Sequence, residues 1–286
     1  MQENHPQKSH ASNRDATYTL GRTSHETTRL IEQSKIYGES TRLLCERAGI
    51  GTGMRVLEIG SGAGDVALML AELVGTSGQV VGVDVNPTIL EAARQRAADA
   101  GIKNVEFVAD DARTLTFADK FDALVGRFVL MYMANPVDAL QKLVAHLKHG
   151  GIIAFQEPEY TLYPAISHPE TPLMNQLIQW ILDVFEHSGA HLNMGIGLYQ
   201  AFVEVGLPPP EMHLHAPIGA AANWAGYRYM VTIFQSLLPL LEKYGIATAE
   251  QVGINTLGER IREEVLLSKR PFFLPLHVTA HARLTS

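Results

Sequence analysis

Glycines and carboxylates stand where a strand pattern gives way to a helix pattern. The stretch VLEIGSGAGDVALML, residues 56–70, begins as an apolar, β-branched run and resumes as a helix after Gly60, Gly62 and Gly64. Glycine lets the backbone bend tightly and approach a ligand, because it has no Cβ. The sequence therefore predicts a ligand-binding turn at this point.

The residues of this turn exclude two familiar phosphate sites. The dinucleotide fingerprint GxGxxG would need glycine where this chain has Asp65, and the phosphate loop GxxxxGK[ST] is absent. A carboxylate at the beginning of a helix would also repel a pyrophosphate. Glu58 adds a second acid, with no base nearby in the sequence. We therefore expect a ligand that bears an ammonium or sulfonium group.

Further acids follow the next two predicted strands. Asp84 ends VVGVD, where a carboxylate can accept hydrogen bonds from both hydroxyls of a ribose. Asp110 and Asp111 follow VEFVA, in a position to accept from the exocyclic amine of an adenine. Each aspartate alone would be interpreted as a turn or capping residue. Together, at the ends of successive strands, they favour a nucleoside site.

A parallel sheet is the architecture that brings these residues together. Strands are expected at 56–59, 79–84, 105–108, 121–126 and 152–156, separated by helices at 65–74, 87–100 and 136–147. Such alternation indicates βαβ units in a doubly wound α/β fold, whose ligand crevice lies at the carboxyl ends of the strands. Every acid named above falls at such an end.

Composition limits the class of protein. The chain has 286 residues, 46% hydrophobic and 19% charged, enough for one large domain with a sizeable core. A formal charge of −7 without a Lys/Arg block argues against nucleic acid as a partner. Its one cysteine excludes an intrachain disulfide, and no apolar run approaches the about 20 residues of a membrane span. Residues 1–19 lack the apolar segment of a signal peptide, so we expect a cytoplasmic protein.

With these motifs in this order, the chain resembles the class I S-adenosylmethionine-dependent methyltransferases, specifically the small-molecule type similar to the ubiquinone-biosynthesis methyltransferases. The resemblance covers about residues 18–157 and rests on VLEIGSGAG, VVGVDVNP, FVADDA and FDALVGRFVLMYMANPVDALQKLVAHLKHGGIIAFQEP. Ser61 stands where many members have Cys, and Asp110 where many have Gly. Neither difference removes a required contact.

The resemblance implies that S-adenosyl-L-methionine is the cofactor and S-adenosyl-L-homocysteine the product. Its methionine part would lie on the backbone of Gly60, Ser61 and Gly62, with Glu58 and Asp65 near the ammonium group.

For the nucleoside, the resemblance assigns the ribose hydroxyls to Asp84 and the adenine amine to Asp111, with Asp110 beside it. The Ala112 amide would bind a ring nitrogen, and Val85 would form a wall of the adenine slot.

Arg127 would end the fourth strand beside the methionine moiety. Gln33 and Tyr37, on a preceding helix, would form a lid, although ordinary helix packing explains them equally well.

Four segments follow from the resemblance and the pattern. We expect a disordered N-terminus at 1–20, lid helices at 21–55, a Rossmann-like cofactor-binding core at 56–157, and at 158–286 the substrate-cap helices with the last two strands of a seven-strand sheet. Within this last segment, helices are expected at 170–189 and 195–205 with two or three more across 223–269, and strands at 211–218 and 271–284.

The acceptor side carries weaker signals. Methyl transfer depends on alignment, and a general base helps when the acceptor is a hydroxyl. Glu157, at the end of the fifth strand, and His191 are the candidate bases, against the alternatives of a structural hydrogen-bond acceptor and a capping histidine. The candidate acceptor-binding residues are Tyr160, Tyr163, Asn193 and Trp224.

No metal site is expected. His187 and His191 are four residues apart, and His213 and His215 share a strand face, but neither pair has a third ligand nearby. The sequence HETTR lacks the second histidine of the HExxH pattern.

The function predicted is methyl transfer to a small, apolar or aromatic metabolite, most readily at oxygen. Methylation at carbon or nitrogen, a nicotinamide-dependent oxidoreductase and a non-catalytic cofactor-binding protein are the alternatives. The apolar stretch TIFQSLLPLLEKYGI suits either the core of the cap or the face of a homodimer.

Overall fold

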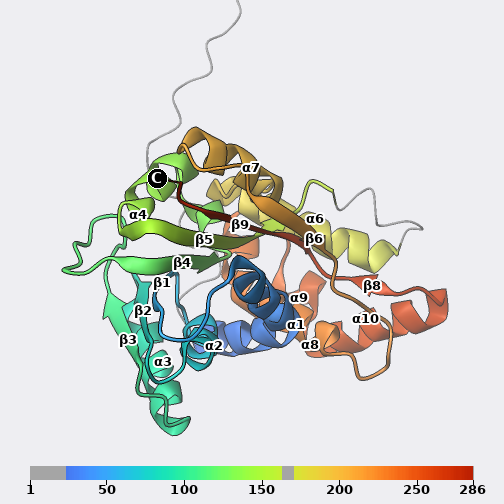
Figure 1. Cartoon of the computed structure of the whole chain (residues 1–286). Helices are drawn as coiled ribbons and strands as arrows, with labels where there is room; N and C mark the ends of the chain where they lie inside the picture. Colours follow the sequence, from blue (N-terminus) through green and yellow to red (C-terminus); the bar gives the residue numbers. More distant parts are fainter. Residues whose placement is uncertain (1–23, 163–170, 286) are drawn as a thin grey trace, which may run out of the picture.

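The computed structural model describes residues 24–162 and 171–285 and contains one large twisted sheet (Figure 1). Its seven strands have the order β3-β2-β1-β4-β5-β9-β6. The strands are β1 Arg55–Ile59, β2 Gln79–Asp84, β3 Val105–Ala109, β4 Phe121–Arg127, β5 Leu147–Glu159, β6 Glu211–His215 and β9 Leu276–Arg283. β1 to β5 pair in parallel, and β9 runs antiparallel to both β5 and β6. The predicted doubly wound, seven-strand fold is confirmed.

Helices separate these strands as the periodicity predicts. They are α1 Ser24–Ala48, α2 Asp65–Val74, α3 Pro87–Asp99, the 3-10 turn η1 Leu130–Tyr132, α4 Pro136–Val144, α6 Pro172–Ser188, α7 Met194–Glu204, α8 Ala225–Lys243, α9 Ala249–Val252 and α10 Ile254–Ser268. Asn86 caps α3 and Asn135 caps α4, each followed by proline at the first helical position.

Three boundaries differ from the prediction. The fifth strand, predicted at 152–156, runs from Leu147 to Glu159, because its pairing with β4 begins at Leu147 and its pairing with β9 continues to Glu159. The predicted strands at 211–218 and 271–284 are each interrupted, since β7 Ile218–Gly219 and β8 Phe272–Phe273 leave the main sheet and pair with each other. The segment predicted to be disordered, 1–20, lies outside the described residues.

Both faces of the sheet are buried, and alternate residues of a strand serve opposite faces. Val56 belongs to a core shared with α1, α2 and α3, whereas Leu57 belongs to the larger core shared with α4, α6, α7 and α8. Phe234, Leu237 and Leu241 are fully buried in this second core. The apolar stretch that contains them therefore forms the core of the cap.

The cap helices meet the lid helix beyond the carboxyl ends of the parallel strands (Figure 1). α8 packs against α1, α6, α9 and α10, and α1 also packs against α2, β5 and β9. None of the helices in the described part of the chain is long and apolar enough to span a bilayer.

Candidate functional site

A cavity of about 470 Å³ lies at the carboxyl ends of β1, β2 and β4. The glycine turn and the strand-end acids line one side of it, and α1, α6, α8 and the segment around η1 line the other. This is the crevice that a doubly wound sheet offers to a ligand. The predicted cofactor-site residues all line this cavity: Gln33, Tyr37, Glu58, Gly60, Ser61, Gly62, Asp65, Asp84, Val85, Asp110, Asp111, Ala112 and Arg127.

The turn needs its glycines. Gly60, Gly62 and Gly64 all have positive φ, and a Cβ on Gly62 would lie 2.9 Å from Leu30 Cδ1 of the lid helix. The N–H groups of Gly60 and Ser61 donate to Val83 O at 2.8 and 3.1 Å. Because these donors are already bonded, a ligand would meet this part of the turn through its Cα atoms and carbonyl oxygens.

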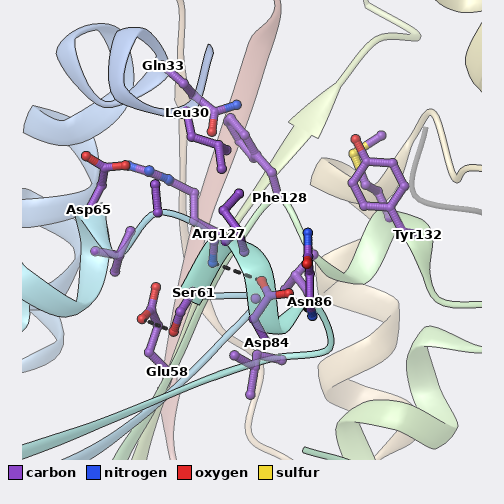
Figure 2. A pocket seen from close by; sticks show the side chains of 18 of the residues that line it. Leu30, Gln33, Glu58, Ser61, Asp65, Asp84, Asn86, Arg127, Phe128 and Tyr132 are labelled. Carbon is purple, nitrogen blue, oxygen red and sulfur yellow. Dashed lines mark hydrogen bonds between the residues drawn. The ribbon is translucent and has the colours of Figure 1, made fainter. Parts of the chain in front are cut away.

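Asp84 joins the turn to the end of β2. Its Oδ2 accepts the N–H of Gly62 at 2.9 Å, and its Oδ1 accepts the N–H of Asn86 at 2.8 Å (Figure 2). Each carboxylate oxygen can accept a second hydrogen bond. Asp84 therefore holds the turn and also lines the cavity.

Glu58 is buried beneath the turn. The hydroxyl of Ser61 donates to its Oε2 at 2.5 Å, as Figure 2 shows. Burial raises the pKa of Glu58 to about 8, against the opposing effects of the Ser61 hydrogen bond and the charge of Arg127. The group can therefore exist protonated or ionised near neutral pH.

Asp65 is not the unpaired acid that we expected. Arg96 of α3, remote in sequence, donates to its Oδ1 at 2.7 Å. Arg127 also extends toward Asp65 in Figure 2. The expectation that no base is near the turn was wrong, because βαβ winding brings α3 beside the beginning of α2.

At the predicted adenine end of the cavity, an acid is likewise paired with an arginine. Arg113 donates to Asp111 through Nε, 2.9 Å from Oδ1, and through Nη2, 2.5 Å from Oδ2. Val85, which also lines the cavity, is 59% exposed. Its side chain is therefore accessible to pack against a flat ligand, as predicted. The roles predicted for Asp110, Asp111 and Ala112 stay predictions.

The lid helix contributes buried polar groups. Gln33 Nε2 donates to the hydroxyl of Tyr229 in α8 at 3.2 Å, and the Tyr37 hydroxyl donates to Pro275 O at 3.3 Å. Tyr37 also packs edge-on against Phe128 and Tyr229. Both predicted lid residues therefore line the cavity and also bind the cap.

Glu157 is a structural acceptor and lies outside the cavity lining. Its Oε1 accepts the N–H groups of Val129 and Leu130 at 3.0 and 2.8 Å, and its Oε2 accepts that of Met131 at 3.3 Å. The structure therefore favours the alternative of a structural hydrogen-bond acceptor over the predicted base, because the carboxylate satisfies the beginning of η1 from within the core. Burial nevertheless raises its pKa to about 7, in opposition to these three hydrogen bonds.

Of the other residues predicted on the acceptor side, only some line the cavity. Tyr160 lines the cavity, whereas His191 donates from Nε2 to Met133 O, 3.0 Å away, and does not line it. Asn193 is exposed at the start of α7, and Trp224 packs against Tyr227 and Phe272. None of these three residues lines the cavity. Tyr163 lies outside the described residues.

Most residues on the apolar side of the cavity were not predicted as site residues. Its lining includes Met131, Tyr132, Met133, Ile181, Phe185, Tyr229 and Ile233. Arg29 was missed as well, although a charged residue on the apolar-spaced face of a predicted helix was a signal. In the described ranges, no cluster of three or more His, Cys, Asp or Glu could hold a metal ion.

Stability is expected to fall as the pH rises from about 6.5 to 8. Glu58 and Glu157, with pKa values of about 8 and 7 in the folded chain, keep protons that the unfolded chain releases near 4.5. Unfolding therefore releases protons, and the loss should be about 1 kcal/mol per pH unit for Glu58 up to about pH 8, with a similar contribution from Glu157 that fades above about pH 7. Below this window His277, whose pKa burial lowers to about 3, acts in the opposite direction.

Thermal or urea unfolding across this pH range would measure the effect. Glu58→Gln keeps an acceptor for Ser61 and should flatten the profile, whereas Glu72→Gln, at a side chain 62% exposed, should not. A wild-type stability that is constant or rises from pH 6.5 to 8 would contradict this prediction.

Comparisons with known proteins identify the family of the chain. Residues 50–195 match the family model described as a methyltransferase domain. The chain is 39% identical over 146 residues, 48% of its length, to the ubiquinone/menaquinone biosynthesis C-methyltransferase UbiE of Pseudomonas savastanoi. It is 37% identical over 130 residues, 44% of its length, to the aklanonic acid methyltransferase DauC of a Streptomyces strain. The matches cover 57% and 59% of these two relatives, so the chain spans less than two thirds of their length.

A solved structure is similar over more of the chain. The YcgJ protein of Bacillus subtilis superposes with a TM-score of 0.57 at 19% identity, covering 87% of this chain and 99% of that one. The likeness concerns the fold, and it extends beyond the first five strands into the cap.

Proposed function

The chain belongs to the family of class I methyltransferase domains, and from that membership we propose that it transfers a methyl group from S-adenosyl-L-methionine to a small, apolar or aromatic metabolite. The observation that carries this proposal is one cavity with two unlike sides. An acid-rich side at the strand ends suits a cationic nucleoside, and an apolar side under the cap suits the acceptor.

The residues present fit this cofactor. Gly60 and Gly62 line the cavity without a Cβ, and the Asp84 carboxylate lines it where a ribose would present two donors. The Asp111 carboxylate has about four acceptor positions, and Arg113 occupies some of them. The adenine amine would donate to a remaining position or would replace Arg113 as the donor. Bound there, the cofactor supplies a methyl group on positively charged sulfur.

The protein would contribute alignment and exclusion of water. Met131, Ile181 and Phe185 form an apolar wall, and the lid and cap are joined by the Gln33–Tyr229 hydrogen bond. Holding two reactants in register in such a site can account for most of the acceleration of a displacement reaction.

We propose that the acceptor brings its own activated nucleophile. Among the described residues that line the apolar side there is no histidine, and the carboxylates lie at the strand ends. Because no general base is at hand, an acidic hydroxyl or a carboxylate is the acceptor that we favour. Carbon is the second candidate, since the relative UbiE is a C-methyltransferase at 39% identity.

Titration with S-adenosylhomocysteine and with NAD(H) would separate the proposed function from an oxidoreductase. A metabolite extract incubated with methyl-labelled cofactor would then reveal the product by mass spectrometry, and NMR would identify the methylated atom. We expect tight binding of S-adenosylhomocysteine and a labelled small molecule. Preference for NAD(H), or cofactor binding without transfer to any component of the extract, would overturn the proposal.

A further inference from the structure

We propose that two copies of the chain form a symmetric dimer by pairing their β6 edge strands in antiparallel fashion, with the two-fold axis at His213. The inference concerns an interaction surface and does not depend on the proposed function. It follows from an open sheet edge, a group of exposed apolar side chains beside that edge, and a strand sequence that is complementary to itself.

β6 is the last strand of the seven-strand sheet, and among the described strands it pairs with β9 alone (Figure 1). In an antiparallel pair, the N–H and C=O groups of alternate residues point away from the partner strand. Within the described part of the chain, the outer edge of β6 therefore presents backbone donors and acceptors that no strand pairs. Its five residues, EMHLH, include neither a lysine nor a proline, which commonly keep sheet edges from pairing.

Exposed apolar side chains gather beside this edge. Ile196, Tyr199 and Val203 follow one another at helical spacing on α7, and these three and Leu214 of β6 are 44–56% exposed. Among the described residues, they are four of the nine large apolar side chains that are exposed. Such a grouping is typical of an interaction surface.

The α7 side chains and Leu214 belong to one face of the sheet. A Cβ on Gly195 would lie 3.1 Å from Val278 Cγ2, so α7 begins directly over the Val278 side chain of β9. Val278 is the β9 partner of Leu214, and residues directly opposite each other in an antiparallel pair point to the same face. The edge of β6 and the exposed stripe of α7 therefore form a single surface, the β6–α7 surface.

The sequence of β6 is complementary to its own copy. When His213 lies opposite His213 of the second copy, all five residues of the strand find a partner. Met212 then faces Leu214 of the second copy, which joins apolar side chains on the α7 face. On the other face, Glu211 meets His215, so that a carboxylate faces an imidazole and never another carboxylate. A two-fold interface requires this kind of self-complementarity.

Prolines on both sides of β6 favour this register. Pro210 precedes the strand and Pro217 follows it by two residues, and neither has an N–H group for a ladder. A ladder centred on Met212 would bring Pro210 opposite Leu214, and one centred on Leu214 would bring Pro217 opposite Glu211. Both would pair fewer residues of β6 than the ladder centred on His213.

The first test measures the mass of the full chain by size-exclusion chromatography with light scattering, in reducing buffer. We expect twice 31.4 kDa at the highest concentrations, about 100 µM. Leu214→Lys should weaken the dimer at least about tenfold, because a charge enters the apolar part of the surface, and Tyr199→Lys should act in the same direction. Leu267→Lys, at a residue 84% exposed on α10, is the matched control and should leave the dimer unchanged.

Single cysteines locate the two-fold axis. In the proposed ladder the two His213 Cα atoms lie about 4.5–5.5 Å apart, within the range of a disulfide. The two Glu211 Cα atoms are four residues apart along the strands, about 14 Å. Mild oxidation should therefore link His213→Cys into a covalent dimer, whereas Glu211→Cys, on the same face, should stay unlinked. The native Cys45 is buried, and the wild type treated in the same way should also stay unlinked.

A wild-type chain that is monomeric at every concentration would overturn the inference. A dimer that withstands both lysine variants of the β6–α7 surface would do the same. Cross-linking of Glu211→Cys as readily as of His213→Cys, or no cross-linking of a dimeric His213→Cys protein, would show that the copies meet in another register or through another face.

Discussion

Replacing Asp84 with alanine is expected to weaken the binding of S-adenosylhomocysteine by at least about 100-fold, the equivalent of about 3 kcal/mol. Two losses add. The ribose hydroxyls would lose a charged acceptor, and the N–H groups of Gly62 and Asn86, now 2.9 and 2.8 Å from its oxygens, would lose theirs. The glycine turn would then be less well held before any ligand arrives. Isothermal titration calorimetry measures the change directly.

Asp119→Ala is the control for this prediction, because Asp119 is exposed and does not line the cavity. It should bind S-adenosylhomocysteine as the wild type does. An Asp84→Ala protein that folds and binds within about threefold of the wild type would show that the nucleoside lies elsewhere.

Glu157→Ala is expected to destabilise the fold by about 3–5 kcal/mol. The variant leaves the N–H groups of Val129, Leu130 and Met131 without their carboxylate acceptor, in a region where Leu130 and Met131 are at most 1% exposed. Buried donors without partners cost about 1–3 kcal/mol each, and the costs of neighbouring donors overlap. Urea unfolding at a fixed pH would measure the loss.

Glu157→Gln separates this structural role from catalysis. Its amide oxygen can still accept from Val129 and Leu130, so the variant should fold, with a lowered melting temperature. Once an acceptor is found, its turnover rate at room temperature should stay within about tenfold of the wild-type rate, a smaller loss than removal of a general base causes. Glu106→Ala, at an exposed residue of β3, is the stability control. A stable Glu157→Gln protein whose turnover is slower by about three orders of magnitude would restore the glutamate as a base.

The sequence by itself determined the cofactor side. Gly60, Asp84 and Asp111 follow predicted strands, and parallel βαβ units bring the carboxyl ends of strands together whatever the details of packing. Two kinds of signal come from residues that are close in sequence: the alternation of strand and helix patterns, and the Asn-Pro pairs at the beginning of the helices at Pro87 and Pro136. The elements and the residues of this side could therefore be predicted from neighbours along the chain.

Only the tertiary structure decided how the acids are paired and what lies opposite them. Asp65 and Arg96 are separated by a helix and a strand, and no local pattern announces their contact. Glu157 and Gln156 illustrate the same limit, since they are adjacent on β5 yet bond to η1 and to Thr41 of α1 respectively. A shift of one residue in register would exchange those faces.

The acceptor side depends on contacts of the longest range. Arg29 and Tyr160 come from the lid helix and the end of the fifth strand, and α6 and α8 complete the wall from the second half of the chain. Their positions follow from how apolar helix faces pack against one another and against the sheet, which fixes side-chain directions only once the core is assembled. The sequence by itself therefore determined the strand-end residues where the cofactor is expected, whereas packing decided which side chains line the opposite side of the cavity.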